Sequence, residues 1–464
     1  MMNFASKVLL ASGSSLGKSV RGLYGAVPGV AIALGLGVAC AGLSGGRADA
    51  AEGDFWNVIQ GFHGSQSTDR KPEPIVDTLE DLRPNKIPFR SDEMLTAMDG
   101  AFAFYQKIAS AGGWPSIPGP RMIRPGDDDQ RVPALRKRLT VEGYLRRSGG
   151  HDSYSYDGEL EVAVKRFQEN HGLRPSGRVD RPTLDELNIT AEARLKQLRL
   201  NAVRLQELNH MRPEERYILV NVPAFQLEAV ERYDVQLRHR VIVGRNERET
   251  PNVKATIKAL NFFPYWRVPD SIGTLDLVPR LRKEPDYLEK EKIRVFSAQT
   301  AQEMDTRTID WKQVDPTKIK FKQDPGPQNA LGLVRIDMSN EHGVYMHDTP
   351  MKKLFEQRSR NFSAGCVRVQ EVFQLAEWIA RLEPGWDQPG RVEQILQSGQ
   401  AVDLTLSRPL PVYFAYVTAW AEPNGVVQFR PDIYNRDGVN SKHSGDVDPN
   451  EAPPAPIPPQ ALAP

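Results

Sequence analysis

The period of the hydrophobic residues changes at Pro213, and this change decides the fold class. In the preceding segment, 191–213, apolar residues recur at the spacing of one helix face: Leu195, Leu198, Ala202, Leu205 and Leu208. Beyond it, alternate residues are apolar, which predicts strands over 217–222 and 225–230. We therefore predict an α+β multi-domain protein with a helical N-terminal part and a mostly β C-terminal domain.

Composition places the chain among multi-domain globular proteins. Its 464 residues correspond to about two to three domains. The 60 basic and 59 acidic side chains nearly cancel, which argues against a nucleic-acid partner bound through bulk charge. The stretch 438–464 is rich in proline and alanine, and is predicted to be a disordered tail.

The first fifty residues have the composition of an export signal. Three basic residues precede the apolar, glycine-rich run 27–43, and Ala48-Asp49-Ala50 fits a small-x-small cleavage site. We expect 1–50 to be a signal peptide and the mature chain to be periplasmic. If uncleaved, the signal would be an inner-membrane anchor and the only membrane contact. Lipidation of Cys40 is a weaker alternative, because Gly37 stands where leucine is usual.

The helical part divides into three predicted segments before the β domain: a scaffold segment (51–127), a helical module (128–190) and a linker helix (191–213). The scaffold segment 51–127 contains a helix that Ser91 opens as N-cap. Residues 128–190 form a module with three predicted helices: 132–145, 160–170 and 181–187. This order and the phrase Val164-Lys165-Arg166-Phe167-Gln168 resemble the three-helix peptidoglycan-binding domain of bacterial wall enzymes. A helical spacer without a ligand is the alternative.

A charged insertion interrupts the predicted β domain, which spans 214–437. The insertion covers 271–329 and carries Trp311. Long insertions beside active sites are commonly lids. We predict a lid rather than an inert surface subdomain, because the chain returns from it directly into the strand that carries His347.

Cys366 would be the single cysteine of the mature chain, so it cannot form an internal disulfide. Its neighbours Ser363-Ala364-Gly365 favour a reactive nucleophile over a small buried hydrophobe. Strand alternation puts Tyr345 and His347 on one face, and Gly365 permits a tight turn before the thiol. We predict that Cys366 is the nucleophile and that His347 takes and returns its proton.

Further residues complete the predicted site. Tyr345 and the peptide N–H of Cys366 would donate to an oxyanion, and Ser363 and Gly365 belong to the same oxyanion and substrate-binding set. The alternative for Tyr345 is a plain core aromatic residue.

Two charged residues are also assigned. Arg368 would hold a substrate carboxylate or stabilise the site, unless it is a structural ion-pair partner. Asp348 would orient His347, a role that a backbone carbonyl could equally fill. A helix beginning near Glu371 would favour a thiolate if its N-terminus pointed at the sulfur. No spacing fits a zinc motif, so neither a metal nor a cofactor is expected.

The residues around the nucleophile closely resemble the signature of bacterial L,D-transpeptidases with a YkuD-type catalytic domain, in their long, lid-bearing class. The similarity rests on His347-Asp348-Thr349-Pro350, Arg360 and Ser363-Ala364-Gly365-Cys366-Val367-Arg368-Val369. Supporting stretches lie at 263–272, 325–332 and 418–420. Arg267 departs from the pattern, which has asparagine there.

This resemblance implies a two-step acyl transfer on peptidoglycan tetrapeptide stems. Cys366 would attack the meso-diaminopimelate carbonyl and expel D-Ala, and an acceptor diaminopimelate amine would then resolve the thioester into a cross-link. It also implies acylation by carbapenems. The alternatives are an L,D-carboxypeptidase, a transpeptidase that attaches proteins to the wall, and a non-catalytic wall-binding protein. A papain-like protease and a sortase fit the cysteine motif poorly.

Overall fold

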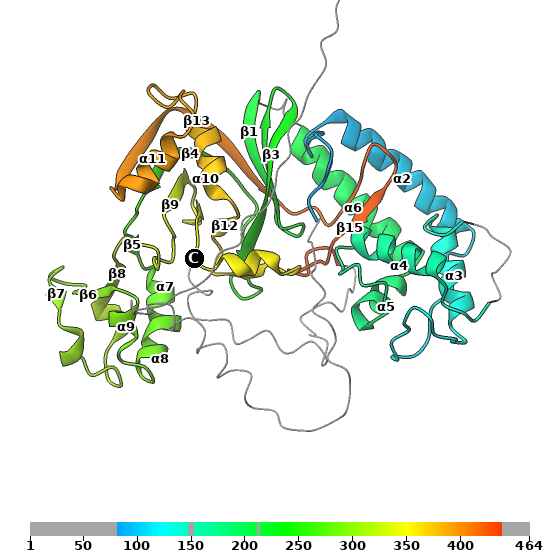
Figure 1. Cartoon of the computed structure of the whole chain (residues 1–464), viewed down its shortest axis with the longest axis horizontal. Coiled ribbons are helices and arrows are strands. Elements are labelled where there is room, and N and C mark those ends of the chain that lie inside the picture. The colour runs from blue at the N-terminus through cyan, green and yellow to red at the C-terminus, as the bar shows by residue number, and fades with distance from the viewer. Residues whose placement is uncertain (1–80, 147–152, 211–213, 439–464) are drawn as a thin grey trace, which may run out of the picture. The chain divides into compact units, whose positions relative to one another are not determined.

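The computed structural model describes residues 81–146, 153–210 and 214–438, all within one compact unit (Figure 1). The predicted signal peptide, most of segment 51–127 before its helix and nearly all of the predicted tail lie outside these residues. Among the helices of the described ranges, none combines the length and the apolar character that a membrane span requires.

Two long helices of the N-terminal part lie against each other. Helix α2 (Asp92–Ser110) begins at Ser91, whose side chain accepts a hydrogen bond from the N–H of Met94, as predicted. Helix α6 (Ala191–Asn209) is capped in the same way by Thr190. Their apolar faces share one buried cluster with the C-terminal hairpin. The helical spacing of apolar residues in the sequence therefore corresponds to helix faces that are packed in the structure.

The predicted three-helix module is present between these helices. Its helices are α3 (Val132–Val141), α4 (Gly158–Asn170) and α5 (Arg181–Leu187), around their own apolar cluster. Helix α3 ends earlier than predicted because Gly143, at φ +83°, reverses the chain. Helix α4 begins earlier because Asp157 caps it.

A nine-stranded sheet forms the β domain and closes on itself. The order is β11-β3-β12-β10-β9-β4-β13-β1-β2, and β2 also pairs with β3. The strands are β1 (Arg216–Asn221), β2 (Gln226–Glu231), β3 (Asp234–Gly244), β4 (Val253–Phe262), β9 (Val334–Ser339), β10 (Met346–His347), β11 (Asn361–Ser363), β12 (Val367–Val369) and β13 (Val402–Ala415). Helices α10 (Val372–Ala380) and α11 (Arg391–Ser398) join its main core. The α+β fold class is confirmed.

The insertion is a small α+β subdomain with its own core, here called the insertion subdomain (residues 266–331). Its four-stranded sheet, β5-β8-β6-β7, starts at Trp266, before the predicted boundary. The elements are β5 (Trp266–Arg267), α7 (Asp270–Ile272), η1 (Gly273–Leu277), α8 (Val278–Leu281), α9 (Tyr287–Lys290), β6 (Ile293–Ser297), β7 (Glu303–Met304), η2 (Thr306–Thr308), η3 (Pro316–Lys318) and β8 (Ile319–Gln323).

The C-terminal strands belong to two separate parts. Strand β13 ends at Ala415, and a separate hairpin follows. Its strands are β14 (Ala419–Ala421) and β15 (Val427–Phe429). The break occurs where Thr418 donates its backbone N–H to Asn201 of α6, which draws the chain away from the barrel. Strand β15 contacts α4, among the N-terminal helices (Figure 1).

The segment 81–90 is held on the barrel by buried ion pairs. Arg83 contacts Glu228 at 2.8 Å and Glu422 at 2.7 Å, with all three side chains buried. Arg360 of the signature lies 2.7 Å from Asp81. Because buried charges are costly unless paired, these contacts fix the segment before α2 in one place.

Candidate active site

The two segments predicted to be catalytic lie on neighbouring barrel strands. Strands β10 and β12 are parallel, with His347 opposite Arg368, and the N–H of Val367 donates to the carbonyl of Tyr345 at 3.0 Å. Cys366 immediately precedes β12. Residues 19 positions apart in the sequence are therefore brought to neighbouring strands, with His347 on β10 and Cys366 next to the start of β12.

Burial keeps the Cys366 thiol protonated. The residue is 5 % exposed, and burial raises the pKa of its thiol to about 11. Hydrogen bonds from the backbone and side chain of Tyr345 and the charges of Arg368 and Arg335 act in the opposite direction. A thiolate, which the sequence favoured only if a helix N-terminus pointed at the sulfur, is therefore not the resting form, because desolvation outweighs the cations.

His347 is fully buried, and its ring orientation is fixed. Nδ1 lies 2.5 Å from the backbone carbonyl oxygen of Asp348, which can only accept, so Nδ1 carries the proton. Nε2 is buried and has no hydrogen-bond partner. Burial, followed by the charge of Arg368, holds the pKa of His347 well below its usual range. The imidazole is neutral, with its lone pair available as a base.

Of the two groups that the sequence analysis offered for orienting His347, the backbone carbonyl of Asp348 does so and its carboxylate does not. Its oxygen accepts from the N–H of Leu333 at 3.0 Å, and it pairs with Lys352. It also fills the space that a side chain at Gly332 would need, and Gly332 has φ +60°. The carboxylate thus secures the point where the insertion subdomain rejoins the barrel, while the backbone carbonyl orients the histidine.

Ser363 and Gly365 shape the turn before Cys366. The Ser363 hydroxyl donates to the carbonyl of Cys366 at 2.5 Å and accepts from the N–H of Gly365 at 3.1 Å. Gly365 has φ +116°, which favours glycine. Since the hydroxyl of Ser363 is fully buried and bonded within the turn, its predicted contact with substrate is replaced by a structural role.

Arg368 lies beside the thiol but is enclosed. Its side chain has no exposed surface, and burial lowers the pKa of its guanidinium to about 10, while the proximity of Cys366 raises it. An enclosed cation stabilises negative charge on the sulfur. It is poorly placed for the other predicted role, which is holding a substrate carboxylate.

Arg335 is a site residue that the sequence analysis missed. It lies on β9 opposite His347, and its guanidinium carbon is 5.4 Å from the centre of the Tyr345 ring. Its charge lowers the pKa of Cys366, and about 31 % of its side chain is exposed. Alternation over 334–339 could have assigned it a face, but only the register with β10 shows which face holds the site.

The insertion subdomain contacts this site. Its apolar core packs against Tyr345, which hydrogen-bonds to Cys366, and against Ala364, two residues before it in the sequence. Tyr345 and His347 have ring centres 5.7 Å apart. Among the described residues, no group of three or more His, Cys, Asp or Glu side chains is arranged to hold a metal ion.

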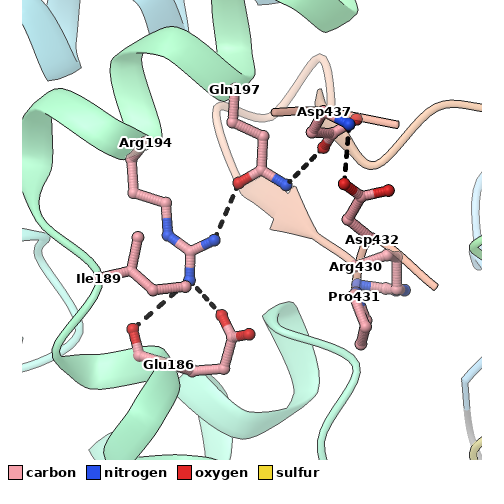
Figure 2. A pocket seen from close by; sticks show the side chains of 8 residues that line it. All are labelled: Glu186, Ile189, Arg194, Gln197, Arg430, Pro431, Asp432 and Asp437. Carbon is pink, nitrogen blue, oxygen red and sulfur yellow. Dashed lines mark hydrogen bonds and ion pairs between the residues drawn. The ribbon is translucent and has the colours of Figure 1, made fainter. Parts of the chain in front are cut away.

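Figure 2 shows a separate small pocket, which none of these residues lines. Arg194 of α6 donates to Gln197 at 2.9 Å and pairs with Glu186 of the three-helix module. Gln197 in turn donates to Asp437 at 3.3 Å. The contacts tie the module, α6 and the segment after β15 together, so this pocket is part of a structural junction.

Residues 215–395 match the family model of the L,D-transpeptidase catalytic domain, YkuD. The chain carries an L,D-transpeptidase catalytic domain. Residues 128–187 match the model described as "Putative peptidoglycan binding domain". The expected family resemblance is confirmed in both parts of the chain.

A Haemophilus influenzae protein named "Putative L,D-transpeptidase" is 32% identical over 257 residues, which are 55% of this chain and 50% of that protein. The chain thus spans about half the length of this curated relative.

Two solved L,D-transpeptidase structures are also similar. The one from Xylanimonas cellulosilytica shares 15% identity over 64% of this chain and 98% of its own, with a TM-score of 0.20. The one from Stackebrandtia nassauensis shares 12% identity over 65% of this chain and 96% of its own, with a TM-score of 0.24. Scores this low do not establish a shared fold.

Proposed function

We propose that this chain is a peptidoglycan L,D-transpeptidase whose nucleophile is Cys366. The observation that carries the proposal is the state of His347. Its Nδ1–H is bound to a backbone carbonyl, and its Nε2 is an unpartnered buried base on the strand beside the cysteine. A buried polar atom without a partner costs stability, so its retention is consistent with a catalytic role.

In the first step, Nε2 of His347 takes the thiol proton as the sulfur attacks the meso-diaminopimelate carbonyl of a tetrapeptide stem. The N–H of Cys366 and the Tyr345 hydroxyl donate to the oxyanion, and the charges of Arg368 and Arg335 stabilise it. The tetrahedral intermediate collapses as the bond to D-Ala breaks, and His347 returns the proton to the leaving amine. A thioester remains.

In the second step, the side-chain amine of an acceptor diaminopimelate attacks the thioester. His347 takes a proton from the attacking amine and returns it to the departing sulfur, so the enzyme is regenerated. The new amide joins two stems. We propose that the insertion subdomain acts as a lid that excludes water, because water in place of the amine would yield a carboxypeptidase. With residues 1–50 as signal, the reaction takes place in the periplasm.

Product analysis tests this proposal. The mature chain and its Cys366→Ala variant are each incubated with purified disaccharide-tetrapeptide, and the products are separated and weighed by mass spectrometry. The proposal predicts cross-linked dimer and free D-Ala for the wild type alone. Free tripeptide without dimer would identify a carboxypeptidase. Transfer only to an added protein amine would identify a wall-attaching enzyme, and binding without any product would identify a wall-binding protein.

A carbapenem provides a second readout that is independent of the acceptor. The wild-type chain is predicted to gain the mass of one carbapenem on Cys366, and the alanine variant is predicted to gain none. A folded wild-type chain without an adduct would contradict the acyl chemistry.

A further inference from the structure

The loop 245–250 is bound to the turn that carries the nucleophile. The N–H of Arg245 donates to the carbonyl of Ser363 at 2.9 Å. The hydroxyl of Thr250 donates to the carbonyl of Gly365 at 2.8 Å. These hydrogen bonds hold the backbone of the loop, from which its side chains extend, next to the turn that carries Cys366.

Two arginines of this loop share one carboxylate of the insertion subdomain. Nη1 of Arg248 lies 2.6 Å from one oxygen of Asp276, and Nη2 of Arg245 lies 3.5 Å from the other. Asp276 belongs to η1, a π-helical turn, a geometry that is frequent at functional sites. A further carboxylate, on Glu247, is 3.6 Å from Arg245 but 76 % exposed. The two arginines thus carry more positive charge than the partly buried Asp276 neutralises.

These arginines remain accessible, in contrast to Arg368. The side chains of Arg245 and Arg248 are 20 % and 15 % exposed, whereas Arg368 is fully enclosed. Guanidinium groups bind carboxylates in a directional, paired geometry. The two guanidinium groups are already placed around the two oxygens of one carboxylate, that of Asp276. A carboxylate of a ligand could bind them in the same geometry.

We propose that Arg245 and Arg248 bind a carboxylate of the stem peptide, and that Asp276 occupies this site in the empty enzyme. This inference rests on the proposed function and names a recognition site for the same substrate. Displacement of Asp276 removes an anchor of the insertion subdomain beside a thiol that is 5 % exposed. Carboxylate binding and access to Cys366 are thereby coupled.

Calorimetry on the Cys366→Ala chain tests this exchange without turnover. The ligands are a synthetic tetrapeptide stem and analogues that each have one carboxylate amidated. In this background, Arg248→Gln is predicted to weaken binding of the stem about tenfold. One amidated analogue is predicted to bind the Cys366→Ala chain and its Arg248→Gln variant with equal affinity. Asp276→Asn is predicted to strengthen binding about threefold, because the internal competitor is removed.

Arg294→Gln is the matched control, since it removes an arginine that pairs with Asp324 and Glu303 elsewhere in the insertion subdomain. It is predicted to leave binding unchanged. Unchanged or weaker binding by Asp276→Asn would overturn the exchange and leave Asp276 as a structural tie. The Asp276→Asn variant tests the exchange even if the Arg248→Gln variant does not fold.

The two proposals fail in different ways. If the stem binds but neither Arg248→Gln nor any amidation changes its affinity, the carboxylate site is refuted and the proposed function stands. If the stem does not bind the Cys366→Ala chain and the wild type forms no product, the proposed function fails and the carboxylate site fails with it.

Discussion

Nδ1 of His347 donates a hydrogen bond of 2.5 Å to the backbone carbonyl of Asp348, the next residue in the chain. Because the acceptor belongs to the backbone, it is retained whatever side chain stands at position 348. The bond fixes the tautomer in which Nε2 accepts a proton. The carboxylate of Asp348 is free to serve a different purpose, at the base of the insertion subdomain.

Asp348→Asn is therefore predicted to reduce the carbapenem acylation rate by less than about threefold, whereas His347→Gln reduces it by about 10² to 10⁴. Asparagine retains the backbone carbonyl but loses the charge that pairs with Lys352. Asp348→Asn is instead expected to lower the melting temperature. The acylation rates are measured by stopping the reaction at successive times and determining the intact mass of the protein. An Asp348→Asn rate as low as that of His347→Gln would show that the carboxylate is part of the catalytic machinery.

The thiol of the free enzyme is predicted to react slowly with iodoacetamide at neutral pH. Burial raises the pKa of Cys366 to about 11, so about one thiol in ten thousand is ionised at pH 7. A raised pKa means that thiolate forms only as the pH rises, and the labelling rate is predicted to increase between pH 9 and 11. A plateau already reached at pH 6 would indicate a resting thiolate and would contradict this state of the site.

Removal of the Arg335 charge is predicted to move this labelling profile further toward alkaline pH. Arg335 lowers the pKa of Cys366, so Arg335→Met removes a stabiliser of the thiolate, and Arg335→Lys retains part of the effect. Carbapenem acylation at pH 7 is expected to fall about tenfold in the methionine variant. Arg294→Gln, an arginine of the insertion subdomain, is the control. Identical profiles for Arg335→Met and the wild type would remove Arg335 from the site.

Stability is predicted to decrease as the pH falls below about 6.5. His171 is fully buried between the rings of Phe167 and Phe429, and burial holds its pKa well below the usual value. Burial also lowers the pKa of His239 to about 4. The unfolded chain therefore binds protons that the folded chain does not, and acid favours unfolding.

Denaturant unfolding of the wild type and of His171→Phe, at several pH values between 5 and 7.5, checks this effect. Phenylalanine retains an aromatic ring between the two partners but cannot be protonated. The slope of stability with pH, rather than its level, is the readout. A shallower slope is expected for the variant, and His342→Asn, at an exposed position, is expected to retain the wild-type slope. Equal slopes for all three chains would contradict the role of His171.

Local patterns predicted the parts of this protein that depend on neighbouring residues. Ser91 and Thr190 cap their helices as their sequences indicate, because capping involves residues three positions apart. Alternation placed Tyr345 and His347 together. Arg335 and the pairing of Arg248 with Asp276 depend on strand register and on a subdomain contact, which no local pattern encodes. The raised pKa of Cys366 could not be predicted from a local pattern either, since burial is a property of the whole fold.

The most direct test of the account is the location of the acyl group on the enzyme. The wild-type chain and its His347→Gln variant are mixed with tetrapeptide stem, quenched in acid and mapped by tandem mass spectrometry. The account predicts a stem lacking D-Ala, attached as a thioester to Cys366 in the wild type and strongly reduced in the variant. An acyl group on another residue, or cross-linking by a chain that lacks Cys366, would contradict it.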